Sequence, residues 1–127
     1  MRSIAKWFFI TAIIYGLLGM LLGLEMAIAH DHGEMVTHSH IMVIGWLSFS
    51  LFGFYYFQFG KAASRTFSLL HFWMAQLSLI GLIIGLFLFY SGKTEYEPIA
   101  AASSIAYALS FLVFAVTAIP ALWAREE

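Results

Sequence analysis

The sequence predicts an all-α integral membrane protein whose four transmembrane helices form a single domain over residues 1–127. The amino-acid composition and the mean hydropathy are the first two observations that predict this class. Hydrophobic residues make up 62% of the chain and charged residues 10%, and the mean hydropathy is +0.89. Soluble domains carry about 25% charged residues. The third observation is a set of apolar runs that each reach the roughly 20 residues a helix needs to cross a bilayer.

Four apolar runs have this length, and together they leave no room for a soluble domain. They are Ala5–Met26, Met35–Phe59, Phe67–Tyr90 and Pro98–Trp123. The segment Ala27–Ala29 resembles a signal-peptide cleavage site. Glu25 interrupts the apolar stretch just before it, so we expect a retained helix.

The basic residues predict the orientation. Five of the six lie at one end of the predicted helices: Arg2, Lys6, Lys61, Arg65 and Arg125. Because short cytoplasmic loops are enriched in Lys and Arg, both termini are expected in the cytoplasm of a bacterial or archaeal cell. The net charge of −1 gives no indication of nucleic-acid binding. The absence of cysteine excludes disulfides, thiolate metal sites and covalently attached haem.

The stretch Thr37–Trp46 contains the strongest functional pattern. His38 and His40 stand at the start of the second predicted helix, in its outer turns, and an apolar run follows them. Ionisable groups at membrane depth indicate function. On an α-helix, residues two apart project about 200° from each other, so one metal ion cannot take both imidazoles. Each histidine therefore needs a partner of its own.

The outer loop offers an alternative metal site. His30, Asp31 and His32 are ligand types that suit zinc or copper. The other interpretation is a solvated loop whose acids favour the positive N-terminus of the next helix.

His71 is too far along the membrane normal to share a metal with His40. If the connection between the second and third predicted helices turns near Ala62, the two residues differ by 13 positions in depth. At 1.5 Å per residue this is about 20 Å. We therefore expect His71 to be a packed, hydrogen-bonded residue. Gly16, Gly19 and Gly23 share one face of the first helix, which favours close helix packing over ligand contact.

The second and third predicted helices resemble part of a known family. The residues His38-Ser39-His40, Gly45-Trp46, Phe52-Gly53 and Tyr55-Tyr56 are similar to the tenth transmembrane helix of the catalytic subunit of cbb-type heme–copper oxidases and nitric oxide reductases. Leu70-His71-Phe72-Trp73-Met74-Ala75 resembles the start of their eleventh. In that family the first histidine of the pair binds the high-spin haem and the second the low-spin haem. The resemblance implies that His38 and His40 serve two different haems.

The chain also departs from this family. The catalytic subunit has twelve helices in three arcs of four, whereas this chain has four predicted helices and no counterpart of the copper-binding histidine helix. It is therefore not expected to be a complete terminal oxidase. Three copies, each supplying one arc, would rebuild a twelve-helix ring. This predicts a homotrimer in which His40 of one copy faces His38 of the next across a haem.

The predicted function is electron transfer by non-covalently bound haem b. Two histidines fill both axial positions of the iron. Met42, Gly45 and Trp46 are expected to contact the haem, since a small residue lets a flat macrocycle approach and an aromatic packs its face. The expected electron partners are a quinol or a protein at the outer face. Two alternatives stay open: a gas-binding haem sensor or reductase with one open axial site, and a non-haem copper or zinc protein that uses the outer loop.

Overall fold

The computed structural model describes residues 2–126, and the side chains of residues 3–124. Its helices form four membrane-length spans and confirm the predicted all-α four-helix fold. The elements are α1 (Arg2–Ala29), α2 (Met35–His40), the π-helix η1 (Ile41–Leu47), α3 (Ser48–Phe59), α4 (Arg65–Tyr90), the 3₁₀-helix η2 (Thr94–Tyr96) and α5 (Glu97–Glu126). The α2–η1–α3 run is one continuous span.

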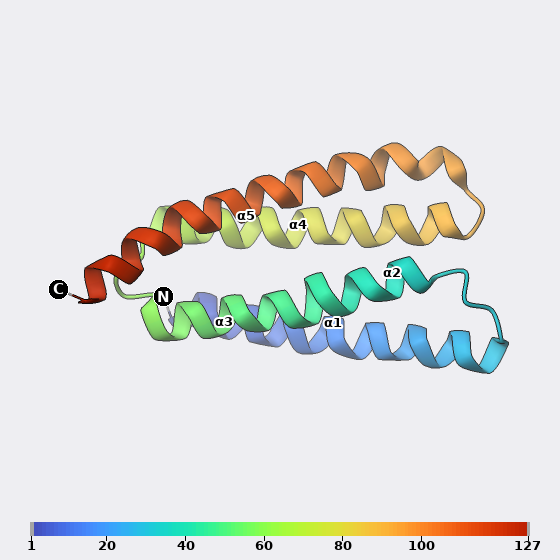
Figure 1. The fold of residues 1–127 in the computed structure, drawn as a ribbon, viewed down its shortest axis with the longest axis horizontal. Helices are drawn as coiled ribbons and strands as arrows, with labels where there is room; N and C mark the ends of the chain where they lie inside the picture. Colours follow the sequence, from blue (N-terminus) through green and yellow to red (C-terminus); the bar gives the residue numbers. More distant parts are fainter. Residues whose placement is uncertain (1, 127) are drawn as a thin grey trace.

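The spans form two antiparallel hairpins that lie side by side (Figure 1). The first pairs α1 with the α2–η1–α3 span, and the second pairs α4 with α5. Both chain ends lie at one end of the bundle, which we call the termini end. The opposite end carries residues 30–34 and 91–96 and is called the loop end. The predicted orientation would place the loop end outside the cell.

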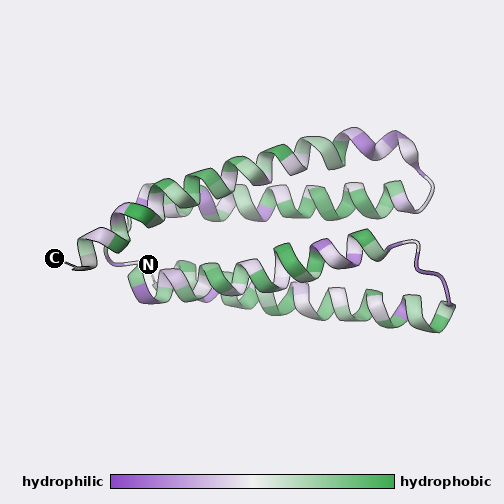
Figure 2. Cartoon of the chain, viewed as in Figure 1, coloured by the Kyte–Doolittle hydropathy of each residue, from purple (hydrophilic) through white to green (hydrophobic). Residues whose placement is uncertain are grey.

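The outer faces of the bundle suit a lipid environment. Apolar residues run along all the long helices, and hydrophilic residues gather at the connections (Figure 2). Large side chains such as Leu21, Leu77 and Leu112 are 60–65% exposed. Surfaces of this extent are covered in a bilayer, so the chain is an integral membrane protein. The side chains of Arg2 and Arg125, which contribute to the predicted orientation, lie outside the described ones.

The glycine face of α1 packs against bulky side chains of the second span, as the sequence predicted. A Cβ atom built on any of these three glycines would crowd a side chain of that span. The pairs are Gly16 with Trp46, Gly19 with Met42, and Gly23 with His38. In a membrane, where burial of apolar area between helices gains little, such close approach is a main source of helix association.

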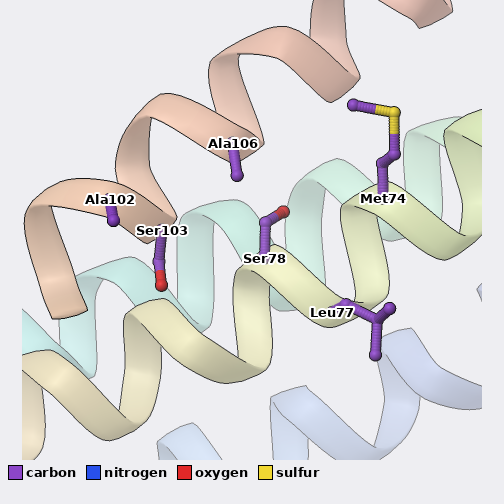
Figure 3. A pocket seen from close by; sticks show the side chains of 6 residues that line it. All are labelled: Met74, Leu77, Ser78, Ala102, Ser103 and Ala106. Atoms are coloured by element: carbon purple, nitrogen blue, oxygen red, sulfur yellow. The ribbon is translucent and has the colours of Figure 1, made fainter.

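Small residues also bring the two helices of the second hairpin close together. A Cβ on Gly85 would lie 2.6 Å from the backbone nitrogen of Ala100, and one on Gly81 would lie 2.5 Å from the Ser103 hydroxyl oxygen. Beside this contact, α4 and α5 leave a shallow groove (Figure 3). Its lining residues are Met74, Leu77, Ser78, Ala102, Ser103 and Ala106.

Two features differ from the expectation of regular helices. The residues Ile41–Leu47, directly after His40, form a π-helix, and the Ser48 hydroxyl donates to the carbonyl of Val43, five residues earlier. π-helical segments are rare and are frequent at functional sites. α5 continues through Pro120 to Glu126, although proline inside a helix removes one backbone hydrogen bond.

Replacing Gly85 by alanine should destabilise the second hairpin. The added methyl group meets the backbone of Ala100, which cannot rotate away, so the helices must separate. We expect Gly85→Ala to lower the free energy of unfolding by about 1–3 kcal/mol. Gly81→Ala is the matched control, because the Ser103 hydroxyl can turn aside. Thermal unfolding in detergent measures both, and equal stability of the two variants would contradict the proposed contact.

Candidate functional site

His38 is held by a backbone carbonyl of α1. Its Nδ1 atom lies 2.7 Å from the carbonyl oxygen of Gly19. The ring lies against Gly23, where a Cβ atom would come within 3.0 Å of the His38 Cε1 atom. The glycine at this position therefore makes room for the imidazole, and the side chain is half-buried between the two spans of the first hairpin.

His40 is held in the same way by its own helix. Its Nδ1 atom lies 2.8 Å from the carbonyl oxygen of Val36, one turn earlier. A carbonyl oxygen only accepts hydrogen bonds, so Nδ1 carries the proton in both histidines. In a neutral imidazole the other nitrogen, Nε2, then has a free lone pair. Both histidines thus present Nε2 as the available ligand atom.

The side chains of His38 and His40 project from α2 on opposite sides of a buried stripe that continues into η1. Thr37 and Ile41 form this stripe, with exposed fractions of 0% and 4%. At 100° per residue, His38 lies about 100° to one side of Thr37, and His40 lies about 60° to the other. Both histidines are half-buried. The expectation that they have separate partners rests on this divergence.

The three residues expected to contact haem pack largely against α1. Met42 and Trp46 lie on Gly19 and Gly16. Gly45 is buried, and a Cβ there would lie 2.8 Å from the Cβ of Tyr15. The space beside Gly45 is therefore filled within the chain. Trp46 is 41% exposed, so part of its ring also faces the outside of the hairpin.

The outer loop shows local hydrogen bonding rather than a metal cage. His30, Asp31 and His32 are exposed, and Asp31 accepts a hydrogen bond from the Gly33 backbone. His30 has a φ of 53°, the left-handed conformation common just after a helix end. Among the side chains that the structure describes, residues 3–124, no three histidine or acidic residues are grouped closely enough to hold a metal ion.

His71 is packed and hydrogen-bonded, as the sequence predicted. Its side chain is fully buried, and its Nδ1 atom lies 2.8 Å from the Tyr56 hydroxyl. Phenyl rings from three helices surround the imidazole, at centroid distances of 4.6–5.3 Å. They belong to Phe8, Phe52 and Phe114. Among the described residues, the Nε2 atom has no hydrogen-bond partner.

The contacts on α1 show how far His71 lies from the histidine pair. His71 packs on Phe8, whereas His38 is bonded to Gly19. These α1 residues are 11 positions apart, or about 16 Å along the helix at 1.5 Å per residue. An iron–imidazole bond is about 2 Å long. His71 is therefore no partner for His38 within one chain.

Polar contacts at two levels of the bundle were not foreseen. Near the middle of the bundle, Gln76 donates to the Thr11 hydroxyl and accepts from the Tyr15 hydroxyl. A single glutamine inside an apolar helix was the available signal. At the loop end, the Glu34 carboxylate accepts from Thr37 and Ser91. The spacing of three residues between Glu34 and Thr37 indicates that their side chains could meet. No local sequence pattern pairs Glu34 with Ser91.

Comparison with protein-family models, curated proteins and solved structures finds no match to the chain. The resemblance to heme–copper oxidases therefore stays a prediction.

The hydrogen bond between Tyr56 and His71 should stabilise the termini end. Tyr56→Phe removes the hydroxyl and leaves the buried Nδ1 of His71 without a partner. An unpaired buried polar group costs about 1–3 kcal/mol, and we expect that loss in the free energy of unfolding. Tyr90→Phe, at a side chain that is 40% exposed, is the control and should unfold like the unaltered protein. A Tyr56→Phe variant of unchanged stability would contradict this role.

Proposed function

We propose that this chain is a small membrane cytochrome that transfers electrons through haem b held between neighbouring copies. His38 of one copy and His40 of the next would be the two axial ligands. The observation that carries the proposal is the hydrogen bond from Nδ1 of each histidine to a backbone carbonyl, which leaves both Nε2 atoms free.

These hydrogen bonds are of the kind that supports a metal ligand. A metal-binding histidine almost always donates its other ring N–H to a carbonyl, carboxylate or water, which fixes its tautomer and orientation. His38 and His40 each have such a bond before any ligand is considered. His71 has Tyr56 as its Nδ1 partner, but phenyl rings enclose it. The pair in α2 is therefore the better candidate.

The donor set fits haem better than a bare metal ion. Zinc and copper sites usually need three or four protein ligands, and the described part of the chain offers no such group. Haem brings four nitrogen ligands in its porphyrin and needs one or two from the protein. His38 and His40 would together hold such a haem, and the group would supply one-electron transfer rather than gas binding.

The geometry supports a site between copies rather than within one. His38 and His40 diverge on α2, and His71 lies about 16 Å away along α1. An interface that joins one surface to a different surface closes into a ring after a fixed number of copies. Three copies of four helices would equal the twelve-helix core that the sequence resembles. We therefore propose a homotrimer, with a quinol or an outer-face protein as electron partner.

The first test removes the ligands. We expect His38→Ala and His40→Ala each to lose most haem, because loss of either axial nitrogen weakens the hold on the iron. The measurement is the absorption spectrum of the detergent-purified protein. An unshifted, fully occupied low-spin spectrum in either variant would exclude that histidine as a ligand.

Two controls accompany this test. His71→Gln replaces a buried histidine while preserving a polar group near Tyr56, and it should retain haem. His30→Asn with His32→Asn alters the outer loop, and asparagine tolerates the left-handed backbone of residue 30. This double variant should also retain haem. A tightly bound copper or zinc that disappears in it would instead support the non-haem alternative, and carbon monoxide binding by the unaltered haem protein would support the gas-binding one.

The second test addresses the assembly. When His38→Ala and His40→Ala chains are mixed, some boundaries in a ring combine an intact His38 with an intact His40. Such assemblies should recover part of the haem that each variant lacks alone. A twofold dimer that pairs His40 with its own mate would recover none. The mass of the haem-loaded protein provides the second measurement, and a monomeric or dimeric mass would exclude the trimer.

A further inference from the structure

Glu34 connects three parts of the loop end. Its backbone carbonyl accepts the His38 N–H at 2.8 Å. One carboxylate oxygen accepts from the Thr37 hydroxyl at 2.7 Å, and the other accepts from the Ser91 hydroxyl at 2.8 Å. Ser91 directly follows α4, whereas Thr37 and His38 belong to α2. A single residue thus ties the histidine-bearing helix to the second hairpin.

The hairpins are held together differently at their two ends. At the termini end, aromatic rings from all the long helices pack on one another, among them Phe8, Phe52 and Phe114. At the loop end, the hydrogen bond between Ser91 and Glu34 spans the two hairpins. A hollow lies beside it, lined by Leu22, Glu25, Met26, Phe87 and Tyr90 among others. At this end the hydrogen bond between Ser91 and Glu34 therefore adds a polar contact to the packing of the buried Thr37 side chain.

We propose that Glu34 is a positioning residue that fixes α2, and with it His38 and His40, against the second hairpin. The buried Thr37 hydroxyl transmits this constraint, because Thr37 is fully buried and directly precedes His38. The part that concerns haem rests on the proposed function. The part that concerns the position of α2 does not.

The hydrogen bonding predicts which substitutions preserve the contact. The single proton of the Ser91 hydroxyl has two acceptors, Glu34 and the Phe87 carbonyl, the latter at 2.6 Å. In Glu34→Gln, the amide oxygen can accept from Thr37 while the amide N–H donates to Ser91, which then donates to Phe87. Glutamine therefore keeps both links without the charge. Glu34→Ala removes both, and Ser91→Ala removes the link between the hairpins alone.

The chain contains no cysteine, so introduced cysteines can be spin-labelled without background. One labelled pair spans the hairpins at the loop end through Met35→Cys and Lys93→Cys, both at exposed positions. The control pair spans them at the termini end through Phe57→Cys and Trp123→Cys, also exposed. Pulsed electron paramagnetic resonance measures each distance distribution in protein diluted with unlabelled copies.

We expect Glu34→Ala and Ser91→Ala to broaden the loop-end distance distribution and to leave the control pair unchanged. Glu34→Gln should keep the narrow distribution of the unaltered chain. An unchanged distribution in both alanine variants would overturn the proposal. Equal broadening in Glu34→Gln would also overturn the proposal, because the contact would then depend on the charge of Glu34 and not on its hydrogen bonds. If Glu34→Ala fails to fold, Ser91→Ala with Glu34→Gln still decides the outcome.

The haem measurement separates this proposal from the proposed function. In haem-loaded protein, the low-spin resonance reports how the two axial imidazoles are oriented. It should shift in Glu34→Ala and return to its original position in Glu34→Gln. A broadened distance with an unmoved resonance would overturn the positioning of the histidines. Haem missing from the unaltered protein as well would overturn the proposed function, and the distances would still decide whether Glu34 positions α2.

Discussion

Close contact between neighbouring helices is the constraint on which the rest of this structure depends. Inside a bilayer, lipid tails are as apolar as leucine, so helices associate through packing and hydrogen bonds. The glycines of α1 admit His38, Met42 and Trp46, and Gly85 of α4 admits the backbone of Ala100. The same close approach gives His38 its hydrogen-bond partner, because the Gly19 carbonyl lies within 2.7 Å of the ring. Helix packing and the orientation of the candidate ligand therefore have a common cause.

The sequence was sufficient to predict the spans, because length and hydropathy are local properties. The predicted second span, Met35–Phe59, has the bounds found in the structure, and the glycine face of α1 packs as its spacing indicated. The π-helix was not predicted, because no residue pattern in Ile41–Leu47 distinguishes it from an α-helix. The continuation of α5 beyond Pro120 also could not be read from the sequence, because proline usually interrupts a helix.

Only part of the geometry around the histidines was predictable from the sequence. The divergence of His38 and His40 follows from helical periodicity, and the isolation of His71 follows from counting residues along a hairpin. The hydrogen bonds that select Nε2 as the free atom depend on where Gly19 lies relative to His38, which is a tertiary property. The expectation for Gly45 shows the same limit. A small residue leaves space, but only the fold shows that Tyr15 fills it.

The two ends of the bundle also differ in what they can accommodate. At the termini end His71 is enclosed by aromatic rings, and a bulky planar group there would have to displace several of them. At the loop end the histidines are half-buried, and a hydrogen bond between Ser91 and Glu34 joins the two hairpins. The histidine pair therefore stands at the less enclosed end of the bundle, where each Nδ1 atom is hydrogen-bonded to a backbone carbonyl and Nε2 is the other ring nitrogen.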